Sequence, residues 1–283
     1  SWDYYMEGDT FCPYIVVDDM VDRSLITEIV VPEEIAGKPV TTITWDFLGA
    51  RKSWAGVKGL AIADAEGNWE DPESYVEKIT FPATVTGFGF MGDPLYFWGG
   101  HDIECEFLGD PYKIDWLCTD DAQWAVDAGI VDYAFDSYKQ DGVRYPYIIV
   151  SDEIDRSTLT ELTVPEIVHG QPVEIIPWDF LGARKSWGGV KGFGVYNEDK
   201  SDWSDPECWL ETITFPATVK KFGYMGDPLW FYNAHEIEGI FLGGVENVEF
   251  LNNGSKEWAY DKAGLPLYSW DYYMEGDTFC PYI

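Results

Sequence analysis

Histidine is the first residue type that could do chemistry here, and the chain has three, His101, His169 and His235. His101 and His235 occupy equivalent places in GGHDIE and NAHEIE, where a neighbouring carboxylate could make each one a base or a metal ligand. No second histidine or cysteine lies near either residue, which favours a loop histidine that opens a strand. The sequence has no G-x-S-x-G, H-E-x-x-H or phosphate-binding glycine loop. We therefore expect no catalytic residues, although carboxylate pairs alone, common by chance among 51 acidic residues, do not decide against a glycosidase.

Two acidic loops carry oxygen side chains at alternating positions, DAEGNWEDPE from Asp64 and NEDKSDWSDPE from Asn197. Calcium takes about six to eight oxygen ligands, often from one such stretch. Neither loop has the glycine and the terminal glutamate of an EF-hand, so a solvated acidic loop is the alternative. Calcium is the one cofactor that the sequence suggests. Its candidate ligands are Asp64, Glu66, Asn68, Glu70, Asp71, Asn197, Asp199, Ser201, Asp202 and Asp205.

The five cysteines form no C-x-x-C motif, which argues against a zinc or redox site. Cys105 and Cys118 lie on consecutive expected strands and could face one another. The sequence leaves two interpretations open, a disulfide between Cys105 and Cys118 or buried free thiols.

Aromatic residues make up 17% of the chain, and most are expected in the core, where tryptophan and tyrosine bury large areas. The segments LYFWGG and LWFYNA are followed by a turn and are better candidates for an exposed platform that stacks on sugar rings. Their candidate residues are Tyr96, Trp98, Trp230 and Tyr232.

The charge excludes two classes of partner. With 18 basic and 51 acidic residues the formal net charge is -33, which opposes binding to a nucleic-acid backbone or an anionic membrane surface. No apolar run approaches the length of a bilayer span, so we expect no membrane insertion.

The elements that must position these residues repeat along the chain. SWDYYMEGDTFCPYI occurs at residues 1–15 and again, unchanged, at residues 269–283. Inside that period of 268 residues lie two diverged halves, offset by 133 to 135 residues, as TWDFLGARKSW at Thr44 and PWDFLGARKSW at Pro177 illustrate. We expect a first half at 1–134, a second at 135–268 and the start of a further copy at 269–283, from a longer tandem array. A cloning artefact is the alternative explanation of the last segment.

Apolar residues alternate with polar ones in short stretches of each half, such as ITEIVVP at Ile26 and VEKITFP at Val76, which is the period of a half-buried strand. Most stretches begin about 20 to 30 residues apart, the spacing of a solenoid in which every turn contributes one strand. Short helices are expected from Asp120 and from Ser255, with Ser255 able to cap the second and Gly264 placed to end it.

Two segments, TEIVVPEEIAGKPVTTI from Thr27 and TELTVPEIVHGQPVEII from Thr160, resemble the BspA-like (Treponema pallidum-type) leucine-rich repeat. The G-[KQ]-P-V step carries most of the resemblance, whereas WDFLG replaces the step AF-x-G-C that is usual in the family. The resemblance implies a β-rich leucine-rich-repeat solenoid of stacked parallel strands with short helices and 3-10 turns, built from two homologous halves. It also implies a secreted or cell-surface protein of a bacterium or protist that attaches or binds partners without catalysis.

The leading hypothesis is therefore an extracellular, non-catalytic repeat protein that binds a protein or glycan at a cell surface. A self-assembling subunit of an extracellular fibre or sheath, stacking end to end on copies of itself, is the alternative, and a carbohydrate-binding module is a third. Apolar alternates such as Ile29, Ile62 and Phe81 are expected to point inward. The outward strand positions form the expected binding face: Glu28, Thr80, Glu104, Glu106, Glu161, Thr214 and Glu238.

Overall fold

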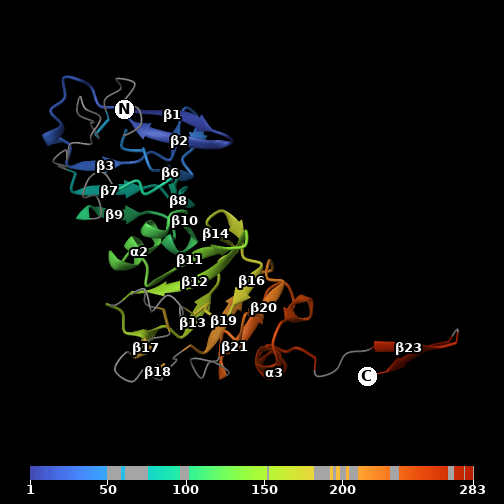
Figure 1. Ribbon diagram of the computed structural model, residues 1–283. Coiled ribbons are helices and arrows are strands. Elements are labelled where there is room, and N and C mark those ends of the chain that lie inside the picture. Colours follow the sequence, from blue (N-terminus) through green and yellow to red (C-terminus); the bar gives the residue numbers. More distant parts are fainter. Residues whose placement is uncertain are drawn as a thin grey trace. The chain divides into compact units, whose positions relative to one another are not determined.

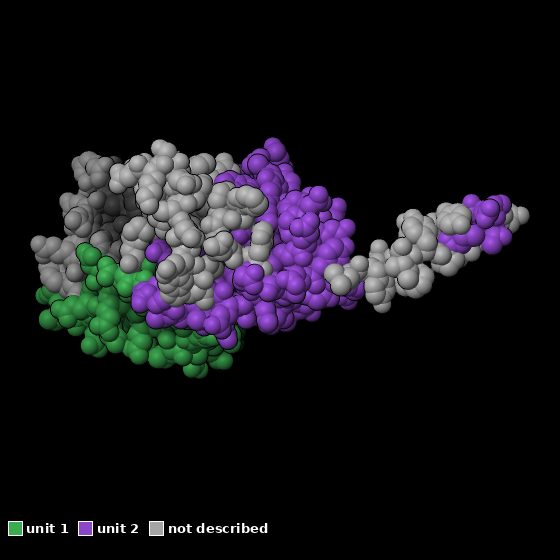
Figure 2. All heavy atoms as spheres, turned by 90° about the horizontal axis from the view of Figure 1, so that it is seen from below, with its two compact units in different colours: residues 1–137, 148–154, 167–171 green, residues 138–147, 155–166, 172–283 purple. Residues whose placement is uncertain are grey.

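The structure, a computed structural model, has two compact units that interleave in the sequence (Figures 1 and 2). Unit 1 comprises residues 1–137, 148–154 and 167–171, and unit 2 comprises residues 138–147, 155–166 and 172–283. Short stretches of the second sequence half thus belong to unit 1. The structure describes residues 1–49, 59–60, 76–95, 102–151, 153–181, 192–193, 196–197, 202–203, 210–229, 236–266, 271–276 and 278–282.

Unit 1 begins with an antiparallel hairpin of β1 (Trp2–Glu7) and β2 (Thr10–Ile15), in which Trp2 lies opposite Ile15. The turn between the strands has Gly8 at φ 59°, a left-handed value that glycine adopts without a steric penalty. The last four residues of β2 are buried, so the hairpin is anchored along one strand.

Six short strands of unit 1 then form two parallel sheets of three strands. Along the chain, these six strands belong alternately to one sheet and to the other. One sheet has the order β3 (Glu28–Val30), β7 (Lys78–Phe81) and β9 (Glu104–Phe107), and the other has β6 (Thr42–Thr44), β8 (Gly87–Phe90) and β10 (Asp115–Trp116).

Unit 2 repeats this plan with the same alternation and the same parallel pairing. Its sheets are β13 (Glu161–Thr163), β19 (Thr212–Phe215) and β21 (Glu238–Phe241), and β16 (Ile175–Pro177), β20 (Lys221–Tyr224) and β22 (Glu249–Phe250).

The described residues also form two-stranded sheets and short 3-10 helices. The pairs are β4 (Glu34–Ile35) with β5 (Lys38–Pro39), β11 (Tyr133–Gln140) with β12 (Val143–Val150), β14 (Ile167–Val168) with β15 (Gln171–Pro172), β17 (Tyr196–Asn197) with β18 (Asp202–Trp203), and β23 (Asp271–Glu275) with β24 (Thr278–Tyr282). The 3-10 helices are η1 (Arg23–Leu25), η4 (Pro111–Lys113), η5 (Arg156–Thr158) and η9 (Val245–Asn247).

The two α-helices of the described residues are α2 (Thr119–Asp127) and α3 (Asn253–Lys262), close to where the sequence predicts them. The expected cap of α3 is wrong. Asn252 caps the helix by accepting the backbone N–H of Ser255 at 2.9 Å, and the Ser255 hydroxyl instead donates to Asp227 at 3.2 Å. Gly264 follows the helix at φ 74°, as expected of a residue that ends it. No helix in the described part of the chain is long and apolar enough to span a membrane.

The core follows from the alternation of apolar residues along the strands. Five apolar residues at the inward positions of the expected strands are buried, namely Ile29, Val31, Leu60, Ile79 and Phe81. The sixth, Ile62, lies outside the described residues. Stacked rings run through each core, with centroids 4.8 Å apart for Phe81 and Phe107 and 4.7 Å apart for Phe215 and Phe241. The predicted β-rich class with parallel strands and few helices is confirmed.

Candidate functional site: strand faces and buried carboxylates

The outer side of the β3–β7–β9 sheet, which we call the first strand face, carries the residues expected to bind. Lys78 lies between Glu28 and Glu104 in the register, and Thr80 lies beside Glu106. The three glutamates are exposed and Thr80 is half-buried. These positions point outward because successive side chains of a strand point to opposite faces of the sheet.

Lys78 neutralises part of the first strand face. Its Nζ lies 2.8 Å from Oε2 of Glu106 and 3.0 Å from Oε1 of Glu104. The hydrogen bond to Glu106, followed by that to Glu104, raises the pKa of Lys78 above its ordinary value. Exposed ion pairs of this kind add little stability, so their main effect is on the local charge.

The β13–β19–β21 sheet presents the equivalent second strand face with a different charge pattern. Thr212 lies between Glu161 and Glu238, at the place that Lys78 takes in the first face. Both glutamates are exposed, and on the next rung Thr214 is half-buried beside Ile240, which is 46% exposed. The second face therefore has two carboxylates with no lysine between them.

Several residues singled out in the sequence lie outside the described part of the chain, as do His101 and His235. These are the aromatic candidates Tyr96, Trp98, Trp230 and Tyr232 and the calcium candidates Asp64, Glu66, Asn68, Glu70, Asp71, Asp199, Ser201 and Asp205. The backbones of the remaining two, Asn197 and Asp202, lie opposite one another in the β17–β18 pair. The described residues hold no group of three or more His, Cys, Asp or Glu that could bind a metal. Calcium binding stays a prediction.

Cys105 and Cys118 are both thiols in the structure, and the disulfide considered for them is not formed. Cys105 lies on β9, whereas Cys118 follows β10 of the other parallel sheet and immediately precedes α2. Consecutive strands belong to different sheets here, which is why the sequence order suggested a pairing that does not occur. Burial, with a smaller contribution from the charge of Glu104, raises the pKa of the Cys105 thiol to about 12. Such a thiol is unreactive at neutral pH.

Two buried aspartates in the repeated WDF motif were missed by the sequence reasoning. Asp46 is fully buried and accepts the Tyr5 hydroxyl at 2.8 Å (Oδ1) and 2.9 Å (Oδ2), together with the Thr44 hydroxyl at 2.8 Å. In unit 2 the equivalent Asp179 is also fully buried and accepts the Tyr138 hydroxyl at 3.0 Å. The repetition of an aspartate inside an aromatic motif was the signal that could have revealed them, since buried carboxylates need hydrogen-bond donors.

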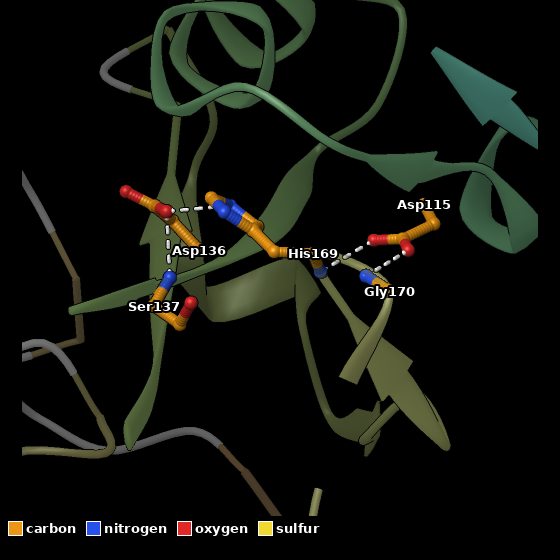
Figure 3. Close-up of polar contacts among 5 residues, drawn as sticks. All are labelled: Asp115, Asp136, Ser137, His169 and Gly170. Atoms are coloured by element: carbon orange, nitrogen blue, oxygen red, sulfur yellow. Dashed lines mark hydrogen bonds and ion pairs between the residues drawn. The ribbon is translucent and has the colours of Figure 1, made fainter. Parts of the chain in front are cut away.

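A third group of polar residues joins separate parts of unit 1 (Figure 3). Nε2 of His169 lies 2.8 Å from Oδ1 of Asp136, which also accepts the backbone N–H of Ser137 at 2.6 Å. The Asp115 carboxylate accepts the backbone N–H groups of His169 and Gly170, each at 2.7 Å. His169 and Gly170 have φ values of 52° and 69°, so Asp115 binds a turn whose two central residues are both left-handed.

The contacts of this group position a turn of the chain. A histidine beside an aspartate is part of many hydrolase sites, but the serine here supplies its backbone N–H to the carboxylate. The side chains of His169 and Asp136 are 6% and 0% exposed, which keeps a substrate away from them. The two contacts instead fix the turn of residues 169–170 on β10 and β11. The equivalent residue of the first half is Ala36. The presence of a histidine in place of this alanine was the sequence signal that could have revealed the group.

Comparison with known proteins adds no relative. No protein-family model matches the chain, and no curated protein or solved structure is significantly similar to it. The resemblance to the BspA-like repeat therefore depends on the quoted motifs alone.

Proposed function

We propose that the chain is an extracellular, non-catalytic leucine-rich-repeat solenoid that binds macromolecules through its outer strand faces. The alternation of strands between two parallel sheets supports the solenoid part of the proposal, because a chain that coils gives each sheet one strand per turn. The G-[KQ]-P-V segments support membership of the BspA-like family, for which a surface location and a role in attachment follow by analogy.

The proposal of binding is based on the second strand face. Glu161 and Glu238 flank Thr212, and Ile240 adds exposed apolar surface beside them. Neighbouring strands lie about 4.8 Å apart, so the backbones of the two glutamates are about 10 Å apart across the sheet. This pattern suits a protein segment that presents lysine or arginine next to an apolar side chain. The binding face thus favours a basic protein partner over a glycan.

The test measures the affinity of the full chain for a decalysine peptide at about 0.15 M salt, where long-range attraction is screened. We expect Glu161→Gln with Glu238→Gln to weaken binding several-fold. The matched control, Glu246→Gln with Glu257→Gln, removes the same charge from exposed positions elsewhere in unit 2. Thr212→Lys should weaken binding as well, because it places a lysine where the first face has one. Equal losses in the face and control variants would show that only net charge matters and would contradict the proposal.

A further inference from the structure

The hairpin β1–β2 is held in unit 1 by a defined set of contacts. Tyr5 donates to both oxygens of the buried Asp46, and the backbone N–H of Ile15 donates to the carbonyl oxygen of Phe47 at 2.8 Å. The ring of Trp2 stacks on that of Phe47 with centroids 6.4 Å apart. We call Asp46 and Phe47 the hairpin acceptor.

Unit 2 uses the same kind of contact. Tyr138 lies on the β11–β12 pair, and its hydroxyl donates to the buried Asp179 at 3.0 Å. Tyr138 corresponds to Tyr5 and Asp179 to Asp46 in the two sequence halves. A tyrosine of a two-stranded sheet bound to a buried aspartate is therefore a recurrent element of this fold.

The hairpin β23–β24 has the sequence of β1–β2 and also its register. Tyr273 lies opposite Cys280 as Tyr5 lies opposite Cys12. The pair next to the turn, Glu275 and Thr278, corresponds to Glu7 and Thr10. The described residues thus contain three hairpins with this tyrosine, and in two of them its hydroxyl donates to the aspartate of a WDF motif.

We propose that β23–β24 of one chain occupies the hairpin acceptor of a second copy, in place of that copy's own β1–β2. The occupant has the same sequence as the hairpin it replaces, so the incoming segment carries the residue types of Tyr5, Ile15 and Trp2 at the corresponding positions. Exchange of identical elements between copies is a low-cost route to assembly. The chains would be linked head to tail, a property that goes beyond binding through the strand faces and does not depend on it.

Two effects set the concentration at which linking occurs. The chain's own β1–β2 competes as an intramolecular ligand, and the effective concentration of such a tethered element is on the order of millimolar. The net charge of -33 makes two copies repel one another. Linking should therefore increase with protein concentration and with salt, and it should respond to any change that weakens one hairpin but not the other.

The experiment uses that competition in the full chain. Sedimentation velocity at about 0.5 M salt would compare the wild type with Tyr5→Phe, Tyr273→Phe and the double variant over a range of concentrations. Tyr5→Phe removes the hydroxyl of the resident hairpin only, so we expect linking at about ten-fold lower concentration, since a hydrogen bond to a charged group is lost. Tyr273→Phe should raise that concentration by the same factor, and the double variant should return to the wild-type value.

A peptide measurement keeps the test decisive if linking of the wild type needs too high a concentration to observe. A fluorescent peptide with the sequence of residues 269–283 should bind the Tyr5→Ala chain, and a peptide with phenylalanine at the position of Tyr273 should bind about ten-fold more weakly. Adding Asp46→Ala should abolish binding of both. Absence of peptide binding to the Tyr5→Ala chain, or a shift of Tyr5→Phe and Tyr273→Phe in the same direction, would overturn the proposal.

Discussion

The same fifteen residues occur at 1–15 and at 269–283, and the two copies differ in their surroundings. Both form a hairpin with the same register. Cys12 in the first copy is 0% exposed, whereas its counterpart Cys280 is half-buried. The hairpin therefore follows from local sequence, because a two-residue turn with a left-handed glycine fixes which residues pair. Burial follows from the hairpin acceptor, which lies far away in the sequence.

The largest effect should come from removing the acceptor. Asp46→Ala leaves the Tyr5 and Thr44 hydroxyls without their buried partner, and we expect the free energy of unfolding to fall by about 3 kcal/mol. The first hairpin should then resemble the second, which thiol labelling of Cys12 would show. Asp179→Ala is the matched control in unit 2 and should destabilise without exposing Cys12. Normal stability of Asp46→Ala in urea unfolding would contradict the account.

Thiol reactivity should separate the two copies directly. Burial is the main cause that raises the pKa of Cys12, and a fully buried thiol reacts only after local opening. We expect Cys280 to react with a disulfide reagent about 100-fold faster than Cys12, as followed by mass spectrometry of the modified peptides. Because Cys12 and Cys280 have the same sequence neighbours, similar rates would show that the first hairpin opens freely.

The pH dependence should identify the first copy as the packed one. Burial, together with the hydrogen bond to Asp3, raises the pKa of Tyr14 to about 12. An unfolded tyrosine loses its proton near pH 10, so this group stabilises the folded chain fully below about pH 10. That contribution is lost as the pH rises toward about 12. Urea unfolding between these values should show the decline, and Tyr14→Phe should flatten it. An unchanged slope in Tyr14→Phe would assign the decline to other groups.

The smallest effect concerns a contact made only by the first copy among the described residues. Nζ of Lys38 lies 5.6 Å from the ring centroids of both Tyr4 and Phe11. Lys38→Gln should lower the free energy of unfolding by about 0.5 to 1 kcal/mol, the range of an exposed cation–π contact. Lys113→Gln, which changes the same charge at an exposed position, is the control. An equal loss in both variants would mean that the rings contribute nothing.

The sequence predicted burial correctly wherever the period of a single strand decides which side chains face the core. Alternation placed Ile29, Ile79 and Phe81 inside and Glu28 and Glu104 outside, because a strand has a fixed period of two. It failed where two distant segments meet. The pairing considered for Cys105 and Cys118 assumed that consecutive strands are neighbours, whereas the strands alternate between sheets. Ser255 has the right type for a helix cap, but Asn252 takes that role and Ser255 binds Asp227.

The sequence by itself predicted the repeat, several of the strands and the positions of the two helices, because hydrophobic period and capping act over a few residues. Only the tertiary structure decided that Asp46 and Asp179 are buried acceptors and that His169 contacts Asp136 while its turn is bound by Asp115. These contacts join residues that lie 33 to 54 positions apart in the sequence, and Tyr5 and Asp46, for example, are 41 positions apart. A buried carboxylate must find its donors in three dimensions, and no local pattern names the partner in advance.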